Sequence, residues 1–195
     1  MMWDKRYSNE EFVYGQSAND FLKQNIDVLP KGKVLCLAEG EGRNAVHLAK
    51  LGYQVTAVDL SAVGLKKAQR LAAEQGVEIE TICADLADFE IEPGYWQGIV
   101  SIFCHLPSEI RRSLHLKVVN GLAESGVFLL EAYTESQIKN GTGGPPVADM
   151  MMSKDGLINE LYGLKFQLCQ EIERDVLEGS LHTGKGAVVQ VIAKK

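Results

Sequence analysis

Long hydrophobic runs are absent from this sequence, and their absence excludes a membrane protein of the helical kind. No apolar stretch approaches the roughly 18 residues that a membrane-spanning helix needs. The first seven residues, Met1-Met2-Trp3-Asp4-Lys5-Arg6-Tyr7, are charged and aromatic, and no apolar segment of a signal peptide follows them. We therefore expect a cytoplasmic protein with no membrane partner.

Cysteine is scarce, and the sequence has no excess of basic residues. The four cysteines (36, 83, 104 and 169) show no CxxC spacing, which argues against a zinc site or a disulfide framework and favours buried, reduced thiols. Lys and Arg total 20 against 26 Asp and Glu, so the formal charge is −6. A general nucleic-acid binder needs a basic face, so we expect neither a metal nor a nucleic-acid partner.

The 195 residues have the composition of one soluble globular domain, with 46% hydrophobic and 24% charged residues. Short apolar segments alternate with amphipathic, helix-like segments, which is typical of an α/β doubly wound, Rossmann-like sheet. The expected strands cover 34–38, 54–58, 77–83, 97–103 and 126–132, and the expected helices cover 43–51, 61–75 and 108–122.

The last 40 residues break this alternation. A helical pattern at 154–162 is followed by two β-type segments, 164–176 and 186–193, separated by a short Gly/Ser/His loop. Two strands joined so closely must pair antiparallel. We therefore expect a parallel sheet that ends in a hairpin, which is not the symmetric two-half dinucleotide fold.

A glycine loop marks the candidate site. The segment Gly40-Glu41-Gly42-Arg43-Asn44-Ala45 fits GxGxx(G/A) between a strand and a helix, where the backbone can approach a ligand closely. Asp59 ends the second strand, 19 residues beyond Gly40, where a carboxylate can accept both hydroxyls of a ribose. Together they predict a cofactor that contains adenosine.

The charge of the loop discriminates between cofactors. Glu39 and Glu41 would repel the pyrophosphate of NAD but would attract the sulfonium and ammonium groups of S-adenosylmethionine (SAM). Asp85, after the third strand, can bind an adenine amino group, cap a helix, or do both. An NAD(P)-dependent oxidoreductase that uses Gly40, Gly42 and Asp59 is the less favoured alternative.

Four segments together resemble the motif set of class I SAM-dependent methyltransferases: Val34–Asn44, Val58–Ser61, Ala84–Leu86 and Ser101–Leu106. The resemblance implies seven strands in the order 3-2-1-4-5-7-6, with strand 7 antiparallel. It also implies a set of cofactor-binding residues: Glu39, Gly40, Glu41, Gly42, Asn44, Asp59, Leu60, Ala84, Asp85, Leu86 and Phe103.

The N-terminal residues carry a second resemblance. Trp3-Asp4-x-Arg6-Tyr7, Phe12–Gly15 and Asn19–Leu22 are similar to the tellurite-resistance branch, which is related to thiopurine methyltransferases. This branch implies that Tyr14 lies near the transferred methyl group. The chain departs from the family's first motif at two positions, where Cys36 replaces an acid and Ala38 a glycine, and we expect Glu39 to supply part of the missing acidic contact.

Methyl transfer from a sulfonium is an in-line displacement, so the protein mainly aligns two reactants and excludes water. A soft thiolate, selenide or tellurium acceptor needs little base, whereas a phenol or amine benefits from one. We assign catalytic roles to Tyr14 and His105, with His105 either orienting or deprotonating the acceptor. The expected acceptor-side residues are Tyr7, Arg43, Tyr133, Thr142, Gly143 and His182.

The sequence therefore predicts one domain, 1–195, with a cap at 1–30 and a substrate-side loop at 134–153. The predicted function is SAM-dependent methyl transfer to S, Se/Te, O or N of a small molecule, by a monomer or homodimer, with S-adenosyl-L-homocysteine (SAH) as product. A non-catalytic SAM-binding protein is the main alternative. Methylation of RNA or protein is disfavoured by the acidic composition and the lack of an added recognition domain.

Overall fold

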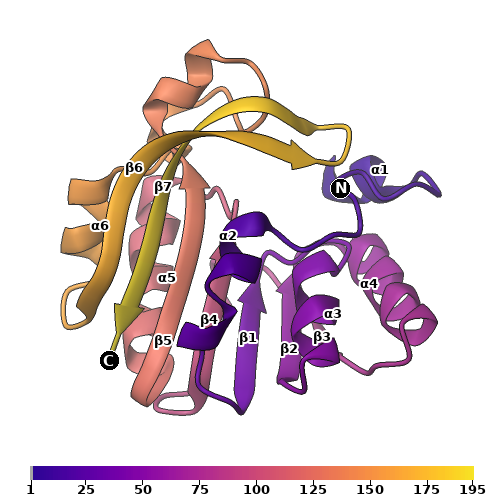
Figure 1. Cartoon of the computed structure of the whole chain (residues 1–195), viewed down its shortest axis with the longest axis horizontal. Helices are drawn as coiled ribbons and strands as arrows, with labels where there is room; N and C mark the ends of the chain where they lie inside the picture. Colours follow the sequence, from indigo (N-terminus) through magenta and orange to yellow (C-terminus); the bar gives the residue numbers. More distant parts are fainter. Residues whose placement is uncertain (1) are drawn as a thin grey trace.

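The computed structural model describes residues 2–195, which form a seven-stranded sheet with helices on both faces (Figure 1). The strand order is β3-β2-β1-β4-β5-β7-β6, and β7 runs antiparallel to both of its neighbours. The predicted α/β fold and strand order are thus confirmed. The strands are β1 (Lys33–Leu37), β2 (Gln54–Asp59), β3 (Glu80–Cys83), β4 (Trp96–Ile102), β5 (Leu122–Tyr133), β6 (Lys165–Glu178) and β7 (His182–Lys194).

Six α-helices and three short 3-10 helices connect the strands in the described residues. The α-helices are α1 (Met2–Tyr7), α2 (Asp20–Gln24), α3 (Arg43–Lys50), α4 (Ala62–Glu74), α5 (Ser108–Gly121) and α6 (Lys154–Glu160). The 3-10 helices are η1 (Ile26–Val28), η2 (Glu135–Lys139) and η3 (Ala148–Met150).

The central strands are mostly apolar because helices bury both faces of the sheet. In β1, Leu35 and Leu37 belong to the core on one face, and Val34 and Cys36 belong to the core on the other. Because β1, β2 and β4 run parallel, their carboxyl ends lie on one edge, where ligands of open α/β sheets bind.

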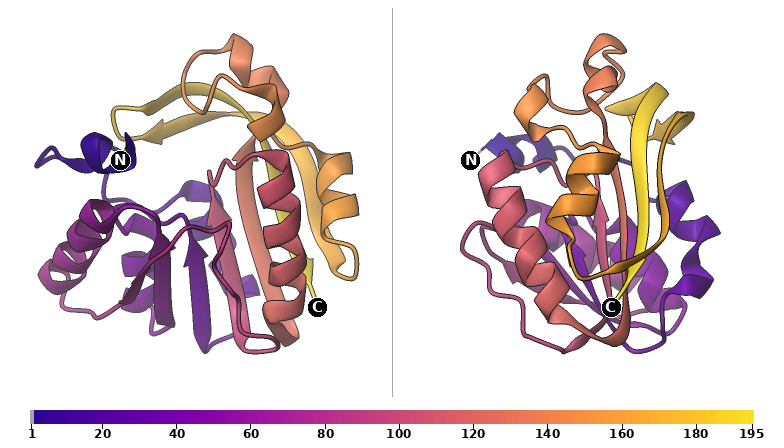
Figure 2. Two further views of the ribbon diagram at one scale, coloured as in Figure 1. Left: turned by 180° about the vertical axis from the view of Figure 1, so that it is seen from behind. Right: turned by 90° about the vertical axis from the view of Figure 1, so that its left-hand side faces the viewer.

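The β6–β7 hairpin is longer than the sequence predicts. It continues beyond the sheet and curves over the carboxyl ends of the other strands (Figures 1 and 2). The predicted loop at 177–185 is mostly strand, because His182 pairs with Glu178 and only residues 179–181 turn. Gly186 permits the close pairing, since a Cβ there would lie 2.7 Å from Val176 Cγ2.

The N-terminal segment, defined here as residues 2–15, closes the same edge. Tyr7 is buried, and a Cβ on Gly40 would lie 2.6 Å from its hydroxyl. The hairpin turn holds the other end of the segment, because Ser180 N donates to Val13 O at 3.0 Å. Met1, the first residue of the predicted cap at 1–30, lies outside the described residues.

The cysteines only partly match the prediction of buried thiols. Cys36 and Cys104 are buried, but Cys169 is half-buried and Cys83 is exposed on the edge strand β3. All four are free thiols. Within residues 2–195, no helix combines the length and the apolar character needed to cross a membrane.

Candidate active site

The glycine loop turns sharply between β1 and α3. Ala38, Gly40 and Gly42 all have positive φ values, of 50°, 61° and 89°. Gly42 also lies against α4, where a Cβ would come within 2.5 Å of Ala68 Cβ. The two glycines are therefore required both by the backbone conformation and by contact with Tyr7 and α4. Ala38 adopts the same left-handed conformation with a side chain, at a cost of about 1 kcal/mol.

Glu39 caps α3 from inside the loop. Its Oε1 accepts from the backbone N–H of Asn44 at 2.9 Å and of Ala45 at 2.7 Å. Burial raises the pKa of the Glu39 carboxyl to about 7, although these amides and Arg43 oppose the shift. The α3 amides that would hold a cofactor pyrophosphate are therefore occupied by a carboxylate, which argues against the NAD(P) alternative.

Asp59 holds the loop from the end of β2. Its Oδ2 accepts from Gly40 N and its Oδ1 accepts from Ser61 N, both at 2.8 Å. Burial raises the pKa of this carboxyl as well. Each oxygen of a carboxylate can accept more than one hydrogen bond, so Asp59 can still take up donors from a ligand in the adjoining cavity.

Glu41 has a different role from the predicted cofactor contact. Its Oε2 accepts from Val13 N at 2.8 Å and Tyr14 N at 3.4 Å, and its Oε1 pairs with Lys67 Nζ at 2.5 Å. Lys67 also donates to Asn9 O at 2.8 Å and Glu11 O at 2.7 Å. We call Glu41 and Lys67 the buried clasp, because they fasten the N-terminal segment to the loop and to α4.

A cavity of about 570 Å³ opens beside these acids, at the carboxyl ends of the strands. Its volume is ordinary for a small-molecule site. It is lined by fourteen of the residues predicted from sequence: Tyr7, Tyr14, Glu39, Glu41, Arg43, Asn44, Asp59, Leu60, Asp85, Leu86, Phe103, His105, Gly143 and His182. The other predicted site residues, which do not line it, are Gly40, Gly42, Ala84, Tyr133 and Thr142.

Asp85 also lines the cavity and is exposed. Its Oδ1 accepts from Ala87 N at 2.9 Å, so the expected capping role is present. The second carboxylate oxygen is available to a ligand. Leu60 and Leu86 provide apolar surface beside it.

Aromatic rings gather in one part of the cavity, which we call the aromatic end. The His182 ring lies 4.6 Å from Tyr14, 4.9 Å from Phe103 and 5.4 Å from Tyr133, measured between centroids. Phe103 stacks on Tyr133 at 4.5 Å. Segments far apart in the sequence therefore form one aromatic wall: the N-terminal segment, the residue after β4, the end of β5 and the hairpin.

His105 is a correction to the sequence prediction. Its Nδ1 hydrogen-bonds with Met150 O at 3.0 Å, and its Nε2 accepts from Tyr133 N at 3.2 Å. Burial lowers the pKa of this imidazole to about 4, so it is neutral at pH 7. With both nitrogens occupied by backbone groups, His105 is not available as a base and instead holds η3 against β5.

Thr142 is a second correction. Its hydroxyl donates to Lys185 O at 2.6 Å and accepts from Gln137 Nε2 at 2.9 Å. It therefore fixes the 141–146 loop to β7 rather than facing the cavity. Gly143 and Gly144, which follow it, do line the cavity.

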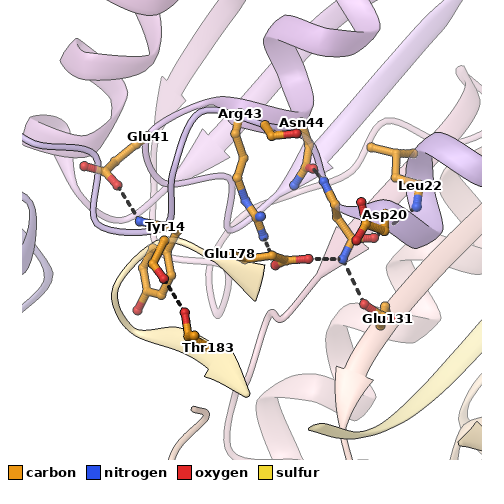
Figure 3. Close-up of polar contacts among 12 residues, drawn as sticks. Tyr14, Asp20, Leu22, Glu41, Arg43, Asn44, Glu131, Glu178 and Thr183 are labelled. Atoms are coloured by element: carbon orange, nitrogen blue, oxygen red, sulfur yellow. Dashed lines mark hydrogen bonds and ion pairs between the residues drawn. The ribbon is translucent and has the colours of Figure 1, made fainter. Parts of the chain in front are cut away.

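A buried charged network supports the cavity and is missing from the sequence prediction. Arg43 Nη2 pairs with Glu178 Oε2 at 2.5 Å, and Asn19 Nδ2 donates to both Glu178 and Glu131 at 2.8 Å (Figure 3). Arg174 Nε donates to Glu131 Oε2 at 3.0 Å. Charged residues at inward positions of β5 and β6 were the available signal, but sequence alone does not show which residues pair.

Comparison with known proteins finds a partial match to a described family. The family model described as "Methyltransferase domain" matches residues 34–126. A curated relative, the ubiquinone biosynthesis O-methyltransferase of Chromobacterium violaceum, is 33% identical over 112 residues. That match covers 54% of this chain and 47% of the relative, so the chain aligns with about half of the relative's length.

Solved structures extend the likeness of fold to the whole chain. A structure titled for conversion of a disulfide bond into a thioacetal group in echinomycin biosynthesis has a TM-score of 0.80 at 17% identity, covering 100% of this chain and 90% of that chain. TehB from Haemophilus influenzae has a TM-score of 0.72 at 21% identity, covering 99% of this chain and 65% of TehB. Residues 34–126 are thus similar to a methyltransferase domain, and the whole chain shares the fold of these solved structures.

Proposed function

We propose that this protein transfers a methyl group from SAM to a heteroatom of a small-molecule acceptor. The observation that carries the proposal is a single cavity that is lined both by acidic side chains and by aromatic rings. The acidic side chains, Glu39, Asp59 and Asp85, suit a cofactor that carries two cations, a ribose and an adenine. The aromatic rings suit the packing of an acceptor.

The residues present fit SAM. Asp59 would accept the ribose hydroxyls, and Asp85 would accept the adenine amino group through its second oxygen. Glu39 would face the cationic methionine part. When bound, SAM supplies an already activated methyl group.

The chain's own contribution is alignment and exclusion of water. The N-terminal segment and the hairpin turn close the cavity, so water is kept from the reacting groups. Tyr14 lines the aromatic end, and its hydroxyl accepts from Arg6 Nη1 at 3.1 Å, which fixes the phenol in place. The likeness to an O-methyltransferase supports a heteroatom acceptor, oxygen included, without choosing among O, S, Se, Te and N.

Calorimetry on ligand-free protein tests the cofactor. We expect micromolar binding of SAM and SAH and no binding of NAD. Asp59→Asn should weaken SAH binding by about 2 kcal/mol, because the ribose hydroxyls lose a charged acceptor. Asp88→Asn is the matched control, since Asp88 is an exposed acid close to Asp85 in the sequence. NAD binding in place of SAM would overturn the proposal, and SAM binding without transfer to any acceptor in a broad panel would favour the non-catalytic alternative.

A further inference from the structure

Three buried polar atoms without partners lie around the aromatic end of the cavity. Among the described residues, four buried side-chain N or O atoms make no hydrogen bond: Arg43 Nη1, Tyr133 Oη, His182 Nδ1 and Trp96 Nε1. Trp96 begins β4 and is therefore at the opposite edge of the sheet from the cavity. The other three belong to residues that line the cavity or lie directly behind its wall.

These three residues converge. A Cβ on Gly143 would lie 2.8 Å from Tyr133 Oη and 2.9 Å from His182 Cδ2, so both rings meet at one point of the 141–146 loop. Arg43 lines the same cavity as His182. Burial lowers the pKa of the His182 imidazole to about 3, and the positive charge of Arg43 is the next largest cause of this shift. The two side chains are therefore close enough to interact electrostatically.

Leaving such groups unpaired is unfavourable, because each has lost its water without gaining a partner. Arg43 satisfies one part of its guanidinium through Glu178, but the second amino group remains free. A guanidinium group carries several N–H donors, so it can bind one carboxylate through two parallel N–H groups or donate to two different carboxylates. A neutral histidine and a phenol hydroxyl supply further donors to the same kind of oxygen.

The aromatic wall indicates what carries that oxygen. Tyr14, Phe103 and His182 present ring surfaces to the cavity, and flat, unsaturated molecules pack well on such surfaces. We propose that the methyl acceptor is a planar organic acid whose carboxylate is bound by Arg43, Tyr133 and His182. This inference rests on the proposed function, since it describes the second substrate of the same site.

The 141–146 loop governs access to this subsite. Gly144 packs on the Tyr133 ring, where a Cβ would lie 2.7 Å from Cδ2, and Gly143 covers the hydroxyl. A carboxylate that reaches Tyr133 Oη therefore displaces these two glycines. The positive φ values of Gly143 and Gly144, 150° and 81°, belong to conformations that only glycine adopts without strain.

The test uses the full-length protein saturated with SAH, with benzoate as the probe and benzamide as its neutral equivalent of the same shape. Binding is followed by calorimetry or by NMR chemical shifts. We expect benzoate to bind at least tenfold more tightly than benzamide. Tyr133→Phe should reduce benzoate affinity about tenfold while leaving SAH affinity unchanged, and Tyr162→Phe, a fully surface tyrosine (87% exposed), should change neither.

The melting temperature of the Tyr133→Phe variant is an independent control for its folding. Removing a buried hydroxyl that has no partner should leave the melting temperature of the ligand-free protein unchanged or raise it, so lost benzoate binding cannot be ascribed to unfolding. Equal affinities for benzoate and benzamide, or an unchanged benzoate affinity in Tyr133→Phe, would overturn the inference while SAH binding still supports the proposed function. If SAH itself does not bind, the proposed function fails, and the carboxylate subsite fails with it.

Discussion

Glu39 is the residue whose ionisation should be visible in the stability of the protein. Its carboxyl has an ordinary pKa of 4.5 when exposed, and burial in the glycine loop raises that value to about 7. Below pH 4.5 the carboxyl is protonated in both the folded and the unfolded chain. As pH rises through 7, the folded protein must ionise a buried acid that the unfolded chain ionises freely.

We therefore expect Glu39 to lower the free energy of unfolding between pH 4.5 and about 7, by an amount on the order of 1–3 kcal/mol. Glu39→Gln keeps a side-chain oxygen for the α3 amides but cannot ionise. Urea denaturation at pH 5 and pH 8 should show a smaller loss of stability with pH in this variant than in the unmodified protein. Glu78→Gln, which changes an exposed glutamate, is the control. The same pH 5 to pH 8 difference in Glu39→Gln and the unmodified protein would contradict this account.

Individual residues could be predicted from sequence where their role depends on local geometry. Asp59 is the last residue of β2 and contacts the glycine loop because parallel strands end on a common edge. His105 and Thr142 also lie near that edge, but their polar atoms are taken by Met150, Tyr133 and Lys185. The sequence thus predicts which polar residues lie at the ligand-binding edge of the sheet. Whether their polar atoms are free to bind a ligand depends on backbone groups of segments that are distant in the sequence.

The buried clasp decides how one whole element, the N-terminal segment, is held. Helix α1 has only six residues, too few to be stable alone. Lys67 satisfies carbonyl groups of the segment and neutralises Glu41, which in turn accepts from Val13 and Tyr14. The segment is ordered by these contacts rather than by its own helix propensity.

Lys67→Met should release the N-terminal segment and leave the sheet folded. Breaking a buried pair typically costs 3–5 kcal/mol, but detaching the segment lets Glu41 regain water, so we expect local rather than global unfolding. Amide hydrogen exchange should become faster at residues 7–14 and stay slow in β1 and β4, and methyl transfer should fall at least about tenfold. Lys66→Met, at the adjacent exposed lysine, should leave both unchanged. Protected amides at 7–14 in Lys67→Met would refute the clasp.

The pattern of apolar residues in the sequence predicts the central strands better than it predicts the C-terminal hairpin. The central strands appear as apolar runs because two faces are buried, and their limits agree with the structure within a few residues. The start of β7, residues 182–185, contains Gly184 and is predicted as loop. This segment is a strand because it pairs with β6 residue by residue. The sequence of the segment alone does not reveal that pairing partner.

At the scale of the whole molecule, the hairpin turn meets the N-terminal segment over the carboxyl ends of the strands (Figure 1), and residues of both line the cavity. Gly179 lies in this contact: a Cβ there would be 2.2 Å from Val13 O and 2.6 Å from Gly15 N. No side chain fits without separating the two segments. The two resemblances in the sequence, at 34–106 and at the N-terminus, thus describe parts that are joined both by the buried clasp and by the hairpin turn.

Gly179→Ala should open the cavity from a distance. The substitution has a matched control in Gly76→Ala, because the φ values are nearly equal, 68° and 69°, and nothing lies within 4 Å of a Cβ at Gly76. Both variants should lose about 1 kcal/mol of stability from backbone strain. Only Gly179→Ala should speed amide exchange at residues 12–15 and weaken SAH binding, by about fivefold or more in calorimetry. Identical effects of the two variants would show that the contact does not close the site.

The contact between Ser180 and Val13 joins residues that are 167 positions apart in the chain. During synthesis the ribosome adds about 5–20 residues each second, so Val13 waits on the order of ten seconds or more before its partner exists. Once residue 133 has emerged, the growing chain can already form β1 to β5, yet its aromatic residues at positions 3–14 have no hairpin to close upon. A nascent chain of this protein should therefore be able to fold β1 to β5 before the hairpin can enclose the cavity.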